Sequence, residues 1–129
     1  MDLRSLDHQK HKTVMVVDND EDLRTVLTTI LDNEGIDVVT AGDGQEALGL
    51  LDEGEVPDLI LTDMSMPGMN GSDFFSRLKS NLKTKDVPVI IISGMQDLEA
   101  KLALIGAKLF LKKPYDLDTL TTLVKRYLH

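Results

Sequence analysis

Short apolar runs alternate along the chain with segments that have the periodicity of amphipathic helices. The apolar runs cover residues 14–17, 36–41, 59–62, 89–92 and 109–111. After the first run, apolar residues recur at the spacing of a helix with one buried face, at Leu23, Val26, Leu27, Ile30 and Leu31. Similar spacing occurs at positions 47, 48 and 51, at 74, 75 and 78, at 98, 102 and 105, and at 117, 120, 124 and 127. This alternation predicts five strands, each followed by a helix.

Short polar residues and glycines mark where these helices begin and end. Asp20, Asp43 and Asp116 stand just before three of the periodic segments. Their carboxylates can accept hydrogen bonds from the free amides of a helix start. Gly35 and Gly106 follow periodic segments, and glycine accepts the left-handed conformation that often ends a helix.

The two central runs, 59–62 and 89–92, are almost entirely apolar. Such strands are typical of parallel sheets that helices cover on both faces. Right-handed crossovers then predict a doubly wound α/β fold, (βα)5, whose five-stranded parallel sheet has the flavodoxin-like order 2-1-3-4-5. The first and third strands are neighbours in that order. Asp18 and Asp63, which end them, are therefore expected to lie side by side.

Several strands end in residues with chemically capable side chains. Asp18 and Asn19 follow the first run, Asp63 the third and Ser93 the fourth, and Lys113 lies just beyond the fifth. Ligands of open parallel sheets bind outside the carboxyl ends of the strands. Carboxylates, a hydroxyl and an ammonium group converging there could hold a divalent cation and a phosphoryl group.

Composition excludes several classes of function. The chain has 129 residues, enough for one domain with a core, and no apolar run long enough to span a membrane. It has no cysteine, which excludes thiol catalysis and thiolate metal sites within it. Its formal net charge of −8 argues against direct binding of nucleic acid. We expect a cytoplasmic protein that does not insert into a membrane.

Four separated motifs resemble those of one known family. They are VVDNDEDLR at 16–24, PDLILTDMSMPGMNG at 57–71, IIISG at 90–94 and FLKKPY at 110–115. In this order and at these spacings, they make residues 13–129 similar to the receiver domain of a two-component response regulator. Residues 1–12 form a polar tail that we expect to be disordered.

This resemblance implies a signalling phosphoacceptor rather than a turnover enzyme. A histidine kinase or a phosphotransfer protein would supply the phosphoryl group, and Asp63 would accept it. The resemblance further implies that Asp18, Asn19, Asp63 and the main-chain carbonyl of Ser65 hold Mg²⁺, for which Mn²⁺ could substitute. A carboxylate can act as a nucleophile towards phosphorus, and a cation is needed between it and the anionic phosphoryl group.

Further roles follow from the same resemblance. Ser93 and Lys113 correspond to the residues that bind phosphoryl oxygens, and Phe110 corresponds to the aromatic residue that moves on activation. The peptide bond between Lys113 and Pro114 is expected to be cis.

The lifetime of the aspartyl phosphate would depend on Ser65 and Met95, which correspond to the positions flanking the path of the hydrolytic water. Met95 cannot position water, which implies a long-lived phosphate. The interaction surface would be formed by the helix around residues 98–105, the strand 109–111 and the last helix. Its partner would be a downstream protein, an output domain outside this chain, or a second copy of the chain.

Asn19 departs from the family pattern, in which this metal ligand is acidic. Its amide oxygen can bind Mg²⁺ but brings no negative charge, so weaker affinity is expected. Two interpretations stay open. The chain is either a working receiver with weak Mg²⁺ binding, or a degenerate receiver that acts as a phosphate-independent interaction domain. The presence of Asp63, Ser93 and Lys113 favours the first.

A flavodoxin-like redox protein or a small hydrolase would share the predicted fold. The acidic segment 18–21 would repel a flavin phosphate, and the hydrolase motif G-x-S-x-G is absent from the sequence. Both alternatives are therefore disfavoured.

Overall fold

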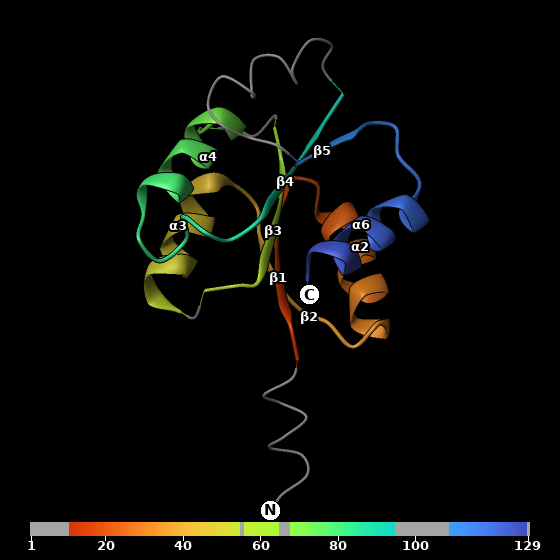
Figure 1. Ribbon diagram of the computed structural model, residues 1–129. Helices are drawn as coiled ribbons and strands as arrows, with labels where there is room; N and C mark the ends of the chain where they lie inside the picture. Colours follow the sequence, from red (N-terminus) through yellow and green to blue (C-terminus); the bar gives the residue numbers. More distant parts are fainter. Residues whose placement is uncertain (1–10, 55, 65–67, 95–108, 129) are drawn as a thin grey trace, which may run out of the picture.

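The computed structural model describes residues 11–54, 56–64, 68–94 and 109–128 and shows a central sheet flanked by helices (Figure 1). The strands are β1 (Thr13–Val17), β2 (Asp37–Ala41), β3 (Leu59–Asp63), β4 (Val89–Ser93) and β5 (Leu109–Lys112). All are parallel and lie in the order β2-β1-β3-β4-β5, which confirms the predicted doubly wound topology.

The described helices are α2 (Glu21–Asn33), α3 (Gly44–Glu53), α4 (Gly71–Ser80) and α6 (Leu117–Tyr127). The helix predicted around residues 98–105 lies outside the described residues. Within the described ranges, no helix is long and apolar enough to cross a membrane.

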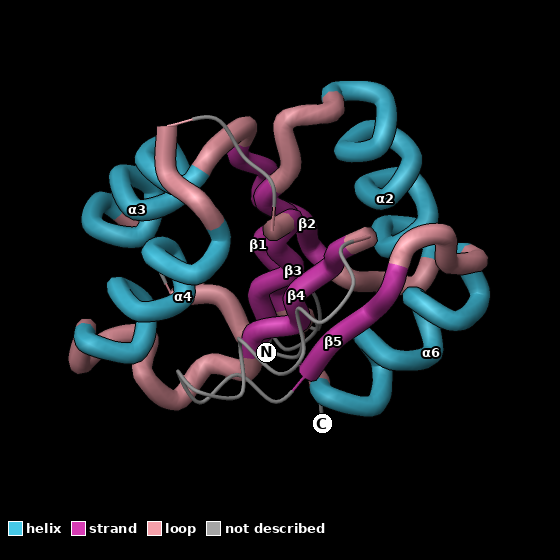
Figure 2. The backbone as a smooth tube through the Cα atoms, turned by 90° about the horizontal axis from the view of Figure 1, so that it is seen from above, coloured by secondary structure: helices cyan, strands magenta, loops and turns pink. Residues whose placement is uncertain are grey.

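The helices form two layers, with α2 and α6 on one face of the sheet and α3 and α4 on the other (Figure 2). Successive side chains of a strand point to opposite faces, so each strand contributes to both layers. Val14 and Val16 of β1 belong to the apolar cluster that also contains residues of α2 and α6. Met15 and Val17 belong to the cluster that contains residues of α3 and α4. The sheet thus separates two apolar cores.

Each described helix begins at a short polar residue whose side chain accepts main-chain hydrogen bonds. These N-cap residues are Asp20, Asp43, Asn70 and Asp116. The three aspartate caps are confirmed, and Asn70 is a fourth cap that the apolar periodicity does not predict. Gly35 follows α2 with a φ angle of 78°, in agreement with its predicted role as a helix stop.

Two residues predicted to face the core are instead among the exposed large apolar residues. Val26 of α2 is 41 % exposed and Leu117 of α6 is 38 % exposed, so the prediction was wrong for both. Val26 lies at the margin of the apolar stripe, which covers little more than a quarter of a helix surface. Leu117 is the first residue of its helix, where the packing against the sheet is only beginning.

Candidate functional site

Four neighbouring strands bring their carboxyl ends to one edge of the sheet. Val17 of β1 pairs with Thr62 of β3, so the residues that follow them, Asp18 and Asp63, emerge from adjacent strands. This is the arrangement that the predicted strand order requires. On the other side of β3, Ser93 at the end of β4 pairs with the last residue of β5. Asp18, Asp63 and Ser93 are all buried.

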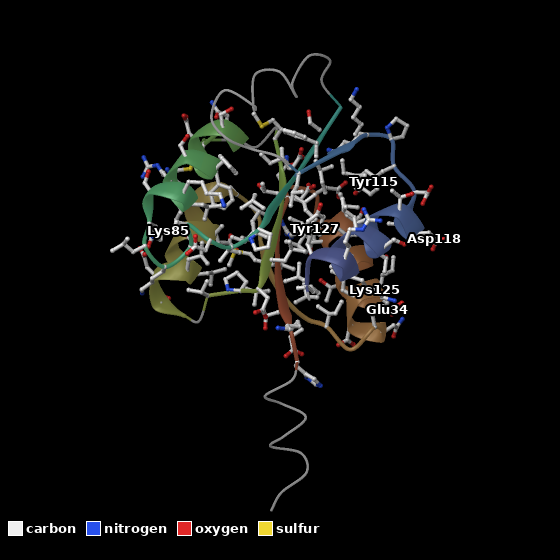
Figure 3. All side chains as sticks on the ribbon, viewed as in Figure 1. Glu34, Lys85, Tyr115, Asp118, Lys125 and Tyr127 are labelled. Carbon is white, nitrogen blue, oxygen red and sulfur yellow. The ribbon has the colours of Figure 1, made fainter. Side chains whose placement is uncertain are left out.

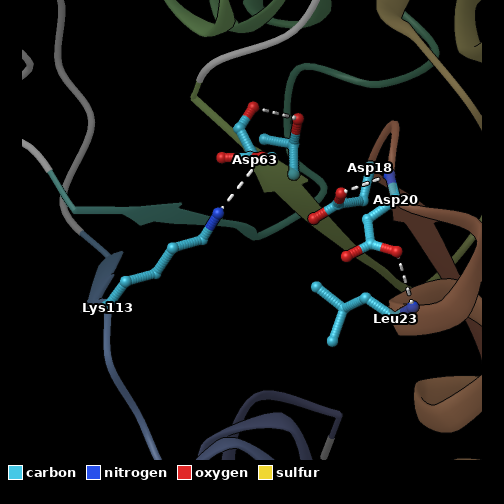
Figure 4. Close-up of polar contacts among 6 residues, drawn as sticks. Asp18, Asp20, Leu23, Asp63 and Lys113 are labelled. Carbon is cyan, nitrogen blue, oxygen red and sulfur yellow. Dashed lines mark hydrogen bonds and ion pairs between the residues drawn. The ribbon is translucent and has the colours of Figure 1, made fainter.

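Lys113 and Asp63 form an ion pair across this edge (Figure 4). The Nζ atom of Lys113 lies 3.2 Å from Oδ2 of Asp63. The amide of Lys113 donates to the carbonyl oxygen of Ser93 over 2.8 Å, and its peptide bond to Pro114 is cis. The Asp63 side chain is 6 % exposed and that of Lys113 is 39 % exposed. The ammonium group therefore reaches the buried carboxylate from the solvent side.

Asp18 is fixed by hydrogen bonds at three of its atoms. Its amide donates to the carbonyl oxygen of Ala41 on β2 over 3.0 Å. Its Oδ1 accepts from the amide of Asp20 over 2.8 Å, and its carbonyl oxygen accepts from Nη1 of Arg24 over 2.7 Å. These bonds tie the end of β1 to β2 and α2, and they leave Oδ2 as the carboxylate oxygen available to a cation.

The electrostatic environment disfavours a charge on Asp18. Burial raises the pKa of its carboxyl group, and the carboxylates of Asp63 and Asp20 raise it further. The hydrogen bond from the Asp20 amide and the positive charge of Lys113 oppose this rise without cancelling it. A divalent cation placed between the carboxylates would remove the repulsion.

Asp20 serves the helix as well as contributing charge to the site. Its Oδ1 accepts hydrogen bonds from the amides of Asp22 and Leu23, at 3.0 Å and 3.3 Å. Figure 4 shows the carboxylate of Asp20 close to that of Asp18 while it holds the first turn of α2. The start of the helix and the acidic site are therefore built from the same loop.

The remaining candidate residues are placed less centrally. Asn19 is exposed between the two aspartates of the loop, and Phe110 is half-buried against the apolar cluster on the α3 and α4 face. Ser65 and Met95 lie outside the described residues. Among the candidates, the structure thus brings Asp18 and Asp63 together at one edge, with Lys113 bonded to the latter.

The donor atoms at this edge fit a hard cation. Asp18 and Asp63 offer carboxylate oxygens and Asn19 an amide oxygen, which are ligand types that Mg²⁺ prefers. In the part of the chain that the structure describes, no group of three or more His, Cys, Asp or Glu side chains is arranged to hold a metal ion. The candidate set combines two carboxylates with neutral oxygens, and Mg²⁺ commonly keeps several waters in such sites.

Two residues near the site were not singled out by the sequence. Arg24 binds the Asp18 carbonyl from the first turn of α2, and Tyr115 lies within electrostatic reach of three site aspartates. Both stand inside the motifs at 16–24 and 110–115, but nothing in their spacing shows that their side chains turn toward the site.

Comparison with known proteins gives a consistent result over nearly the whole chain. Residues 14–125 match the family described as the response regulator receiver domain. Sporulation initiation phosphotransferase F of Bacillus subtilis (strain 168) is 32 % identical over 120 residues, which cover 92 % of this chain and 94 % of the relative.

Solved structures agree with the sequence match. Chemotaxis response regulator CheY4 of Vibrio cholerae superimposes with a TM-score of 0.83 at 28 % identity, over 92 % of this chain and 99 % of that one. Response regulator TrrA of Thermotoga maritima, solved in complex with Mg²⁺ and BeF, has a TM-score of 0.78 at 29 % identity, over 90 % of this chain and 98 % of its own. With its topology and its acidic edge, the chain belongs to the response regulator receiver domains of two-component signal transduction.

Proposed function

We propose that this protein is a cytoplasmic signalling module that accepts a phosphoryl group on Asp63 in the presence of Mg²⁺. The observation that carries the proposal is the position of the Asp63 carboxylate. It is buried at the carboxyl end of β3, next to Asp18, and lies 3.2 Å from the ammonium nitrogen of Lys113. A nucleophile, a cation-binding carboxylate and a fixed positive charge are the parts that phosphoryl transfer to an aspartate needs.

The donor would be the phosphohistidine of a histidine kinase or of a phosphotransfer protein. A carboxylate oxygen of Asp63 forms a bond to phosphorus, the P–N bond of the phosphohistidine breaks, and the imidazole leaves with that electron pair. The ammonium group of Lys113 already forms an ion pair with Asp63, and it would pair with an oxygen of the transferred phosphoryl group. Ser93 is buried at the end of the adjacent strand, and its hydroxyl would donate a hydrogen bond to another phosphoryl oxygen.

The cation would be held by Asp18, Asn19, Asp63 and the main-chain carbonyl of Ser65. Mg²⁺, or Mn²⁺ in its place, would neutralise the charge between the carboxylates and the incoming phosphoryl group. Asn19 brings no charge to this set, so we propose that affinity for Mg²⁺ is low. The choice of cation is supported by the related protein TrrA, which was solved in complex with Mg²⁺ and BeF.

The output would pass through β5 to the surface beside it. Phe110 would change its packing when Ser93 moves toward the phosphoryl group, which would bias a two-state equilibrium. Between β5 and α6 lies a groove of about 590 Å³ whose lining includes Phe110, Leu123 and Arg126. This groove supports docking of a downstream protein, of an output domain or of a second copy of the chain. Ser65 and Met95 would set how long the phosphate lasts.

The domain would extend over residues 13–129, with residues 1–12 as a tail outside it. The competing function is that of a degenerate receiver, which binds partners without phosphate because Asn19 replaces an acidic ligand. Both functions use the same fold, so they are distinguished only by whether Asp63 accepts a phosphoryl group.

The deciding experiment is an acceptance assay. The protein is incubated with acetyl phosphate at increasing Mg²⁺ concentration, and intact-protein mass spectrometry measures the fraction carrying one phosphoryl group. We expect phosphorylation that requires Mg²⁺ and is lost in Asp63→Asn. Asp32→Asn is the matched control, because it removes the same charge from the exposed C-terminal end of α2. Absence of phosphorylation at high Mg²⁺ would contradict the proposal and favour the degenerate receiver.

A further inference from the structure

Tyr115 lies two residues beyond Lys113, whose side chain reaches Asp63 at the acidic edge. It follows the Lys113–Pro114 bond and precedes Asp116, the N-cap of α6. Its ring is half-buried and packs against the apolar cluster that contains residues of α2 and α6. Figure 3 shows Tyr115 where the chain passes from β5 toward α6, on the side of the sheet that these helices cover.

The hydroxyl group of Tyr115 is buried and has no hydrogen-bond partner among the described residues. Other buried hydroxyls in the molecule do have partners: those of Thr62 and Thr84 donate to main-chain carbonyl oxygens. Most buried polar side chains find a partner, and one that does not needs an explanation, such as a bound ion, a water molecule or a functional role. Among the described residues, none accepts a hydrogen bond from this hydroxyl.

The charges that act on this phenol belong to the candidate site. Burial raises the pKa of Tyr115, and the carboxylates of Asp18, Asp63 and Asp20 raise it further. At neutral pH this phenol stays protonated while the carboxylates are ionised, because its ordinary pKa is already far above theirs. Tyr115 is therefore a hydrogen-bond donor without an acceptor among the described residues, and the site aspartates are charged acceptors near enough to act on it electrostatically.

We propose that Tyr115 is a positioning residue of the cation site, whose hydroxyl donates a hydrogen bond to the Asp18 carboxylate, directly or through one water molecule, when a divalent cation is bound. This inference rests on the proposed function, because it assumes that the acidic edge takes a cation. Carboxylates that bind metals are usually hydrogen-bonded by outer residues, which fix their orientation. The Asp20 amide supplies one such bond, to Oδ1, and Tyr115 would supply the second.

The proposed hydrogen bond from Tyr115 to Asp18 matters more for cation binding in this chain because Asn19 is neutral and exposed. With one charged ligand fewer in the set, the affinity for the cation depends more strongly on how well the Asp18 carboxylate is oriented. A hydrogen bond from Tyr115 that forms only when the cation is bound would raise the affinity for the cation. It would add no negative charge to the site without cation, where the carboxylates of Asp63 and Asp20 already repel that of Asp18.

The test compares Tyr115→Phe with Tyr127→Phe. Both substitutions remove one phenolic oxygen, and both rings pack against the same apolar cluster, but Tyr127 is the last residue of α6, far from its N-cap. Thermal unfolding is measured for each protein over a range of MgCl₂ concentrations, and the rise in melting temperature gives the affinity. We expect Tyr115→Phe to weaken Mg²⁺ binding about tenfold, the lower end of the usual loss for an outer-shell partner. Tyr127→Phe should bind as the wild type does.

Metal-free stability separates this role from an ordinary structural one. In EDTA, Tyr115→Phe should melt at the wild-type temperature or above it, because the hydroxyl that it removes has no hydrogen-bond partner among the described residues. A spectroscopic signal adds a second readout. The chain has no tryptophan and two tyrosines, so in Tyr127→Phe the near-ultraviolet absorption of tyrosine comes from Tyr115 alone. MgCl₂ should then produce a saturable difference spectrum at the concentrations that raise the melting temperature.

Each contrary result has a distinct meaning. Wild-type Mg²⁺ affinity in Tyr115→Phe, or no spectral change on saturation with MgCl₂, would overturn the inference and leave the proposed function in place. A clear loss of metal-free stability in Tyr115→Phe would give the hydroxyl a structural role and overturn the inference as well. A wild-type protein that Mg²⁺ does not stabilise would remove the proposed metal site, and the inference with it.

Discussion

The ion pair between Lys113 and Asp63 should contribute measurably to the stability of the metal-free protein. Its perturbation is a double-mutant cycle made of Lys113→Gln, Asp63→Asn and the variant that carries both. Lys113→Gln leaves the buried carboxylates of Asp63 and Asp18 facing each other without the ammonium group that now lies on Asp63. Asp63→Asn removes one of the two repelling charges, so we expect it to be much less harmful.

The geometry sets the size of the effect. At 3.2 Å, two unit charges attract by about 1.3 kcal/mol in bulk water and by about 5 kcal/mol at an effective dielectric constant of about 20. Because the Lys113 side chain is 39 % exposed, solvent screens the pair and the value should fall in the lower part of this range. A coupling free energy of about 1.5–3 kcal/mol also agrees with typical hydrogen bonds to charged groups.

The assay is urea denaturation of the four proteins in EDTA, with the coupling energy taken from the four free energies of unfolding. Lys83→Gln is the matched control, since Lys83 lies exposed in the turn after α4, and its loss should change stability by no more than about 0.5 kcal/mol. A coupling energy below about 0.5 kcal/mol would show that the pair is fully screened. It would then be refuted that Lys113 offsets the repulsion between the carboxylates of the acidic edge before a cation binds.

Three further predictions follow from the site and its supports. Asn19→Asp should strengthen Mg²⁺ binding about tenfold, equivalent to about 1.4 kcal/mol, because it adds a charged ligand; an unchanged affinity by thermal shift would mean that residue 19 does not face the cation. The raised pKa of Asp18 means that the folded metal-free protein binds more protons than the unfolded chain above the ordinary value of 3.8, so its stability falls as pH rises through that window. Asp18→Asn should remove that part of the pH dependence in EDTA and abolish Mg²⁺ binding, and an unaltered pH profile of urea midpoints would contradict this. Asn70→Ala should lower the free energy of unfolding by about 1 kcal/mol, because it deletes the hydrogen bond that Asn70 accepts from the Asp73 amide over 2.9 Å. Asn70→Asp, measured in the same urea titration, should keep this cap and show no such loss.

The sequence predicted those features that depend on periodicity and chain order. The two helix layers follow from apolar runs joined by right-handed crossovers. The strand order, which puts Asp18 and Asp63 on adjacent strands, is the one expected for a flavodoxin-like fold. Helix starts at aspartates were predictable because capping depends on neighbours only two or three residues away. Val26 and Leu117 were misjudged because a helical pattern shows which residues share a face, but not where the covering elements end.

Features that depend on the direction of single side chains escaped prediction. The bond from Arg24 to the Asp18 carbonyl joins a helix to the strand end before it, and only the angle between them decides whether the guanidinium reaches. The burial of the Tyr115 hydroxyl could not be predicted either, because the sequence alone does not distinguish this tyrosine from an ordinary apolar side chain.

The strands that carry the site differ in how deeply they are embedded, and this difference has a consequence for hydrogen exchange. β3 is buried at every residue and lies between β1 and β4, whereas β5 ends the sheet and is at most half-buried. Amide protons of β3 should therefore exchange only when the whole domain unfolds, while those of β5 should exchange through smaller local openings. A chemical change at Asp63 would begin on the part of the sheet that opens least and be expressed on a strand that can shift at low free-energy cost.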